Sequence, residues 1–307
     1  MTWRRAQAAC ALWLGGLLLV GAGDAAAQAA AQQAAPLPQH TVAEVLDPAS
    51  TGPRALQLTA PPGVVLLQFA DLREQARAMG RIVLFIEKVG APRHRVMNVP
   101  EVLQWLRARG TRLELVTLGN NLGAEELARF FNTARLQGEP LTEQERELLR
   151  ELAAWGLLRE QGAGWVPGTA AHTLLTVPLA SQVGGCAACD VTPQNRRAIL
   201  EHELGHGEFA ASAALQHHAR WFWFNVLSPV ARSQWQRFLT QRGYDTNQLQ
   251  IVLGEMHAYL DHTHDTRLFR AEDLDLAPAA LDAQRARYRE GRVAAPALRH
   301  DPGYQLP

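Results

Sequence analysis

The segment at residues 199–207, which reads ILEHELGHG, places two histidines four residues apart with a glutamate directly after the first. Thr192 and Pro193 precede it and predict a helix start, because a threonine hydroxyl can cap the first turn and proline is tolerated at the first helical position. On a helix, residues four apart share one face, so the imidazoles of His202 and His206 can reach the same ion. The sequence therefore predicts a helix with a metal site on one face.

Glu203 is turned by about 100° from His202 on such a helix. Its carboxylate can address a water molecule at the metal without binding the ion, as in other H-E-x-x-H zinc sites. One way of completing the site is excluded: the metzincin pattern needs glycine three residues and histidine six residues after His206, where this chain has Phe209 and Ser212.

A third metal ligand is required, because a catalytic zinc usually has three protein ligands and one open position. The later segment LGEMHAYL provides Glu255, with Tyr259 on the same face of a predicted helix. Asp261 and His262 lie in the same part of the chain and are alternative third ligands. We expect Glu255 to complete the site.

A zinc site with these three ligands and an open position predicts that the protein hydrolyses amide bonds. Glu203 would take a proton from the zinc-activated water and pass it to the leaving amine. Tyr259 is the expected hydrogen-bond donor to the oxyanion that develops on the substrate. Tyr244, His257 and His262 are alternatives for that role.

The HELGH motif with a downstream helical glutamate resembles the gluzincin branch of the HExxH metallopeptidases. The resemblance implies zinc bound by His202, His206 and Glu255, with Glu203 as the general base. In zincins an edge strand binds extended peptide, and by analogy we expect this role for the segment that contains His172 and Leu174–Leu175. The blocks HELGHGEF and GEMHAYL are also similar to secreted bacterial proteins of uncharacterised function.

The N-terminus has the pattern of a secretory signal peptide. Arg4 and Arg5 precede an apolar run at residues 6–20, and Ala25–Ala27 offers a cleavage site. The apolar run is shorter than the roughly 20 residues of a membrane span. We therefore expect a periplasmic or secreted protein that is not inserted in the membrane after cleavage.

Charge and cysteine content narrow the expected partners. Lys and Arg total 30, as do Asp and Glu, so no net charge attracts nucleic acid, and we expect no nucleic-acid partner. In an oxidising compartment, Cys186 and Cys189 are expected to form a disulfide that fastens a glycine-rich loop. The expected substrate is a peptide, a protein or a peptidoglycan-type molecule.

The predicted fold class is α+β, with an N-terminal α/β portion followed by a mainly helical, zincin-like portion. Apolar periodicity predicts helix, strand, helix and strand over residues 66–79, 82–86, 100–106 and 113–118. Two helices and a strand are expected over residues 125–136, 142–158 and 171–177, and Gly119–Gly123 is expected to be a turn. The expected divisions are a signal peptide (1–27), a low-complexity leader (28–60), the α/β portion (61–168), the metal-binding portion (169–275) and a peripheral tail (276–307).

These features together predict a secreted zinc-dependent metallohydrolase, a peptidase of the metalloendopeptidase type that hydrolyses peptide or amide bonds. The alternative is a non-catalytic zinc-binding or scaffold protein of the cell envelope that uses the same ligands.

Overall fold

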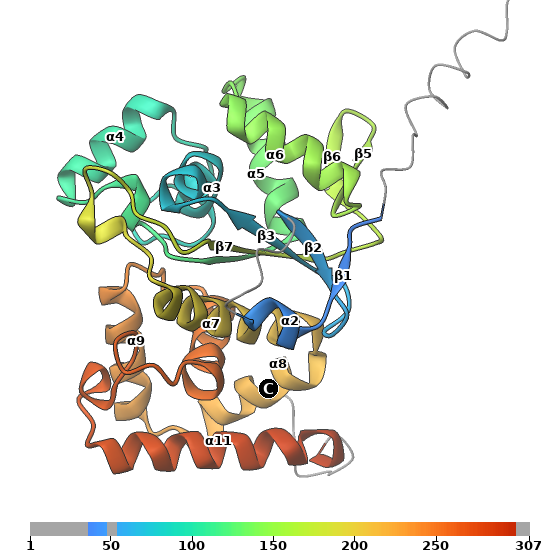
Figure 1. The fold of residues 1–307 in the computed structure, drawn as a ribbon. Helices are drawn as coiled ribbons and strands as arrows, with labels where there is room; N and C mark the ends of the chain where they lie inside the picture. Colours follow the sequence, from blue (N-terminus) through green and yellow to red (C-terminus); the bar gives the residue numbers. More distant parts are fainter. Residues whose placement is uncertain (1–35, 48–53, 299–307) are drawn as a thin grey trace, which may run out of the picture. The chain divides into compact units, whose positions relative to one another are not determined.

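The computed structural model describes residues 36–47 and 54–298, with side chains described as far as residue 292. From Leu37 onward these residues belong to one compact unit. They form a mixed α+β fold, as the sequence predicts, with helices on both faces of one five-stranded sheet (Figure 1). The predicted signal peptide lies outside the described residues.

The sheet has the strand order β1-β2-β3-β7-β4. Its strands are β1 (Gln39–His40), β2 (Ala55–Leu58), β3 (Val64–Phe69), β7 (Thr173–Pro178) and β4 (Asn120–Gly123). The β3 and β7 strands are parallel and buried along their whole length, which explains the nearly continuous apolar sequence of β3. The β4 strand pairs antiparallel to β7 and forms the edge of the described sheet on that side.

Four helices cover one face of the sheet: α3 (Leu72–Ile86), α4 (Val99–Ala108), α5 (Ala124–Gln137) and α6 (Glu143–Ala154). A short hairpin of β5 (Leu158–Gln161) and β6 (Gly164–Pro167) follows them. The predicted helices at 100–106, 125–136 and 142–158 correspond to α4, α5 and α6, although α6 ends at Ala154. Apolar side chains of the sheet, α3, α5 and α6 form the core on this side.

The predicted order of the first two elements is wrong. Residues 64–69 form β3 and residues 72–86 form α3, so the apolar run at 82–86 is the end of a helix rather than a strand. The helix begins after Asp71, whose side chain accepts a hydrogen bond from the amide of Glu74 at 2.7 Å. Its last five residues are buried on every side, so they show no amphipathic period.

The region before β4 also differs from the prediction. Residues 113–118 contain only a 3-10 turn, η1 (Leu113–Leu115), instead of a strand. The strand is β4, at 120–123, where we expected a turn. Its two asparagines and glycine are poor strand formers, and pairing with β7 outweighs that local preference.

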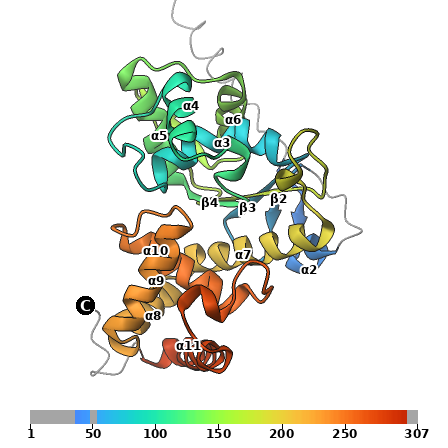
Figure 2. The same cartoon turned by 90° about the vertical axis from the view of Figure 1, so that its left-hand side faces the viewer.

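Helix α7 (Pro193–Ala211) lies against the opposite face of the sheet, between the sheet and the C-terminal helices (Figure 2). Its predicted start is confirmed, because the Thr192 hydroxyl accepts a hydrogen bond from the amide of Asn195 at 3.1 Å. The helix continues through Gly207 to Ala211. A β-carbon at Gly207 would lie 3.1 Å from Leu175 of β7, so this glycine allows α7 to approach the sheet closely.

The C-terminal helices complete the fold on the α7 side. They are α8 (Ala213–Trp221), α9 (Pro229–Gln241), α10 (Leu249–His257) and α11 (Pro278–Leu298), with the π-helices η3 (Phe222–Val226) and η4 (Ala258–His262) and the 3-10 helix η5 (Ala271–Leu274). Their aromatic and aliphatic side chains form a second core. The short helix α2 (Val42–Leu46) also contacts α7.

Three of the predicted divisions differ from the structure. The leader was expected to extend to residue 60, but β1, α2 and β2 lie within it and β1 and β2 belong to the sheet. The boundary after residue 168 separates β7 from its sheet partners. The tail is not peripheral: Tyr288 of α11 is fully buried, and the helix packs on α8 and η4.

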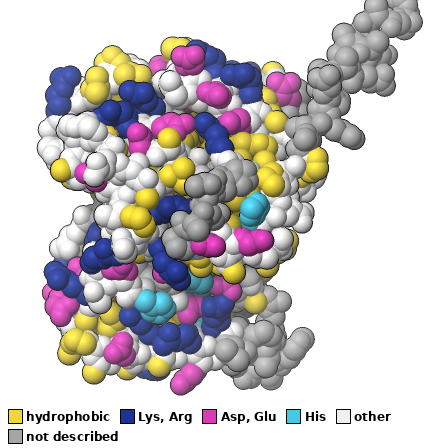
Figure 3. Space-filling view, viewed as in Figure 1, with side chains coloured by type: hydrophobic (Ala, Val, Ile, Leu, Met, Phe, Trp, Pro, Cys, Tyr) yellow, Lys and Arg dark blue, Asp and Glu magenta, His cyan; other side chains and the backbone are white. Residues whose placement is uncertain are grey.

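Cys186 and Cys189 form the predicted disulfide in the loop between β7 and α7. No helix among the described residues is long and apolar enough to cross a membrane. On the face shown in Figure 3, acidic and basic side chains are interspersed.

Candidate metal centre

The two histidines of the motif lie side by side on α7. Their Nε2 atoms are 3.1 Å apart, and both side chains are buried. The spacing follows from the helix, because four residues advance the chain by about one turn. The pair presents two ring nitrogens to the same small volume.

Glu255 of α10 supplies the third group. Its Oε1 lies 3.3 Å from Nε2 of His206, and its Oε2 lies 3.5 Å from Nε2 of His202. Two ligand atoms of a tetrahedral zinc with bonds of about 2.0–2.1 Å are separated by about 3.3 Å. The three side chains therefore already have the spacing of a zinc ligand set and would not need to move to bind the ion.

An unpaired oxygen at this cluster also fits a bound cation. Oε2 of Glu255 is buried and has no hydrogen-bond partner among the described residues. A buried acceptor without a partner is costly, and a metal ion would satisfy the carboxylate oxygen. Asp261 and His262, the alternative third ligands, belong to a different cluster with Glu208.

Thr263 fixes the orientation of His202, and sequence reasoning missed it. The Thr263 hydroxyl donates to the carbonyl of Ala258 at 2.9 Å and lies 2.8 Å from Nδ1 of His202. Because the hydroxyl proton is used, the oxygen accepts from Nδ1–H, and Nε2 keeps its lone pair for the cluster. Hydrogen-bonded partners of this kind are usual behind metal-binding histidines. The only sequence signal for this role is weak, since it consists of a threonine shortly after the segment that contains Glu255.

The charges within the cluster are strongly coupled. Burial opposes ionisation of Glu255, but His206 and His202 outweigh it and hold the pKa of this carboxyl well below its usual range. Although burial works in the other direction, the carboxylate of Glu255 raises the pKa of His206 to about 9. Burial lowers the pKa of His202, so this imidazole stays neutral. In the metal-free protein the centre is thus a carboxylate paired with one imidazolium.

Glu203 is not part of the triad and faces a cleft beside it. Burial raises the pKa of this carboxyl to about 8, and its Oε2 has no hydrogen-bond partner among the described residues. Gly119, next to β4, lies against it: a β-carbon there would be 2.4 Å from Oε1 of Glu203. Sequence reasoning missed Gly119, because only the folded chain brings it to α7.

The cleft consists of two recesses that share Gly119, Glu203 and Tyr244. The first, here called the acidic recess, is also lined by β4 and by Glu87 and Glu126. The second, the basic recess, is also lined by Lys88, Arg242 and Tyr259, among others. Glu203 therefore lies where a molecule that spans both recesses would pass.

Two tyrosines border the cleft. The ring of Tyr259 lies 4.7 Å from that of His202, centroid to centroid, and its hydroxyl stays protonated because burial raises its pKa. Tyr244 lines both recesses, and burial likewise raises its pKa. His257 and His262, the other predicted candidates for this role, line neither recess.

The predicted substrate strand is wrong in position. Leu174 and Leu175 belong to β7, which is paired on both sides by β3 and β4 and has no free edge. His172 packs beside Gly63 and lines neither recess. The edge strand that borders the cleft is β4, through Asn120, Asn121 and Gly123, and Thr173 at the start of β7 also lines it.

Comparison with protein-family models, curated proteins and solved structures gave no match for this chain.

Proposed function

We propose that this protein is a zinc-dependent peptidase of the extracytoplasmic space. The observation that carries the proposal is the convergence of His202, His206 and Glu255, with ligand atoms 3.1–3.5 Å apart, beside the buried carboxyl of Glu203. Zinc suits this set because it binds imidazole and carboxylate ligands, most often with four-coordinate geometry. Three protein ligands leave one coordination position open, as hydrolysis requires.

His202, His206 and Glu255 would hold the ion. When bound, zinc would supply Lewis-acid polarisation of a carbonyl group and would lower the pKa of a water molecule toward 7. Thr263 would keep Nε2 of His202 directed at the ion by accepting the proton of Nδ1.

Glu203 would serve as the proton carrier. Its Oε2 has no hydrogen-bond partner in the part of the chain that the structure describes, and Glu203 lines the cleft, so a water molecule there can donate to it. In the metal-free protein burial raises the pKa of this carboxyl to about 8, so it holds a proton at neutral pH. The charge of a bound zinc ion would favour the carboxylate, which could then take a proton from water and deliver it to the leaving amine. Tyr259 would donate a hydrogen bond to the oxyanion, with Tyr244 as the alternative.

The cleft suits an extended peptide. The β4 strand is an edge strand beside Glu203, and an edge offers unpaired amide and carbonyl groups to another extended chain. A peptide added to this edge would carry an amide bond past Glu203. The predicted signal peptide implies a periplasmic or secreted protein, so peptides, proteins or peptidoglycan-type amides are the expected substrates.

The test is cleavage of a mixed peptide library and of peptidoglycan fragments by the zinc-loaded protein and by Glu203→Gln. The matched control is Glu201→Gln, on the same helix, which removes a carboxylate that pairs with Arg197 at 2.9 Å. We expect Glu203→Gln to keep its zinc and to lose about 10²- to 10⁴-fold in rate, with Glu201→Gln unaffected. Stoichiometric zinc without cleavage of any library member would instead favour the non-catalytic zinc-binding protein.

A further inference from the structure

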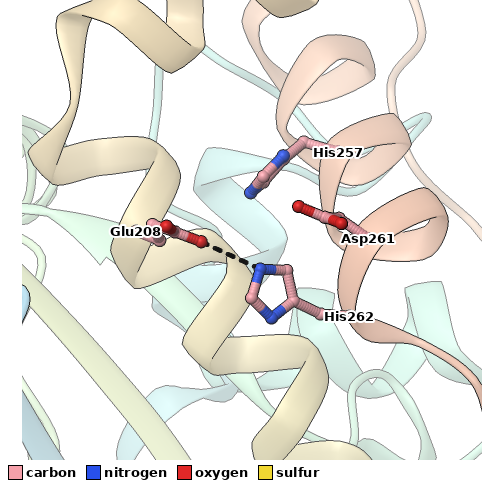
Figure 4. A group of neighbouring side chains, drawn as sticks. All are labelled: Glu208, His257, Asp261 and His262. Carbon is pink, nitrogen blue, oxygen red and sulfur yellow. Dashed lines mark hydrogen bonds and ion pairs between the residues drawn. The ribbon is translucent and has the colours of Figure 1, made fainter. Parts of the chain in front are cut away.

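A second cluster of metal-binding side chains lies on the same helices as the first. It comprises Glu208 of α7, His257 of α10, and Asp261 and His262 of η4 (Figure 4). One nitrogen or oxygen atom from each residue lies within 4.8 Å of the corresponding atoms of the others. The cluster thus brings two imidazoles and two carboxylates to one place.

The two clusters occupy opposite sides of these helices. Glu208 follows His206 by two residues, and His257 follows Glu255 by two residues. Two residues turn a helix by about 200°, so each pair points in opposite directions. The side chains of the second cluster are therefore independent of the first triad, although they share its backbone.

One ring nitrogen of His257 is directed into the second cluster and has no hydrogen-bond partner among the described residues. The residue is fully buried, and its Nδ1 lies 2.9 Å from the hydroxyl of Tyr288. Its Nε2 has no hydrogen-bond partner among the described residues, and the tip of the ring points into the space between Glu208, Asp261 and His262 (Figure 4). A buried polar atom of this kind calls for a partner.

The carboxylates of the cluster are held in place by Arg292 of α11. The guanidinium contacts Oε1 of Glu208 and Oδ2 of Asp261. Oε2 of Glu208 lies 3.0 Å from Nε2 of His262. Glu208 thus uses one oxygen for Arg292 and the other for the cluster, in the way that outer hydrogen bonds orient metal-binding carboxylates.

The π-helix η4 brings His257 and His262 together. In a π-helix, residues five apart become neighbours, and the amide of Thr263 donates to the carbonyl of Ala258 at 3.0 Å in this manner. The rings of His257 and His262 accordingly lie 5.4 Å apart, centroid to centroid. Short π-helical segments occur frequently at functional sites.

We propose that Glu208, His257, Asp261 and His262 bind a second divalent transition-metal ion, separate from the His202, His206 and Glu255 centre. Two imidazoles and two carboxylates suit zinc and its first-row neighbours, such as cobalt and manganese. The ion would fasten α7 to η4 from the side opposite the first centre. Gly205 allows the close contact this needs, since a β-carbon there would lie 2.7 Å from the ring of His262.

Metal stoichiometry tests the proposal. The purified protein is stripped with a chelator and titrated with Zn²⁺, and separately with Co²⁺ monitored by its visible absorption. The titration is repeated on Asp261→Asn/His262→Gln and on His202→Ala/His206→Ala. The matched control is His264→Gln, which replaces an exposed histidine two residues from the cluster. Circular dichroism identifies any variant that does not fold.

We expect two bound ions per chain in the wild type and in His264→Gln, and one in each double variant. Suppose instead that the wild type binds one ion, which His202→Ala/His206→Ala loses and Asp261→Asn/His262→Gln keeps. That result would overturn the second site and leave the first intact. The reverse pattern would support the second site and remove the basis of the proposed function. If Asp261→Asn/His262→Gln does not fold, the result for His202→Ala/His206→Ala decides. One bound ion in that variant supports the second site, and the absence of any bound ion overturns it.

Discussion

The hydroxyl of Thr263 lies 2.8 Å from Nδ1 of His202 and donates a hydrogen bond to the carbonyl of Ala258. This chain of two hydrogen bonds gives His202 the tautomer in which Nε2 is unprotonated. It also connects the motif helix α7 to the residue that directly follows η4, 61 residues later in the sequence, so the orientation of His202 depends on the packing of these two elements.

Replacement of Thr263 by valine should weaken metal binding. Valine has a similar shape but cannot accept the Nδ1 proton, and the loss of such a partner typically lowers metal affinity by about 10- to 100-fold. Competition with a chromophoric chelator measures the zinc dissociation constant. Thr263→Ser keeps the hydroxyl and should bind zinc as the wild type does; equal affinity of Thr263→Val and wild type would refute the role.

Replacement of Gly119 by alanine should impair turnover while metal binding is retained. The added methyl would collide with the carboxyl of Glu203, and a displacement of about 1 Å in a catalytic group can cost about 10²-fold in rate. The rate and the zinc content are both measured. Gly184→Ala is the control, because a β-carbon there would meet no described residue within 4 Å other than its chain neighbours. An unchanged rate in Gly119→Ala would show that Glu203 is not confined by this contact.

Substitution by phenylalanine can distinguish the roles of Tyr259 and Tyr244, the two tyrosines that border the cleft. Phenylalanine keeps the packing and removes only the hydroxyl. We expect Tyr259→Phe to lower kcat by about 10²-fold with little change in KM, because a donor to the oxyanion acts in the transition state. Tyr244→Phe should lower kcat less. If instead Tyr244→Phe shows the larger loss, the role belongs to Tyr244.

The stability of the metal-free protein should fall between pH 7 and pH 9. Burial raises the pKa of Glu203 to about 8, and Glu255 raises that of His206 to about 9. The folded protein therefore holds protons that the unfolded chain has released in this range, and their contribution is lost as pH rises through the two folded pKa values. Urea unfolding in a chelator at pH 7, 8 and 9 measures the trend.

In Glu203→Gln the free energy of unfolding should decrease less from pH 7 to pH 9, because only His206 then loses a proton in this range. Zinc should also reverse the trend, since the ion binds only deprotonated ligands and binds more tightly as pH rises. A stability of the metal-free protein that is constant or increases from pH 7 to pH 9 would contradict the assigned charge states.

Much of the candidate site could be predicted because its signals are local. The spacing of His202 and His206 fixes their geometry as soon as the segment is helical, and Thr192 with Pro193 marks where that helix begins. The place of Glu255 on a later helix predicts it as the third ligand, and its carboxylate lies beside the two histidines. Thr263 and Gly119 could not be identified in this way, since they reach α7 only through tertiary packing.

The fold class could be predicted, but several elements could not. A buried helix and a buried strand have similar apolar sequences, so residues 82–86 carry no period that distinguishes them. The capping side chain of Asp71 is the local signal that would have separated β3 from α3. The β4 strand has no such signal, because its conformation depends on β7.

Anomalous diffraction at the zinc absorption edge, from crystals of the zinc-loaded protein, tests the central claim most directly. The account predicts a strong peak about 2.0–2.2 Å from Nε2 of His202, from Nε2 of His206 and from one carboxylate oxygen of Glu255. A fully zinc-loaded protein with no peak between these three side chains would contradict it.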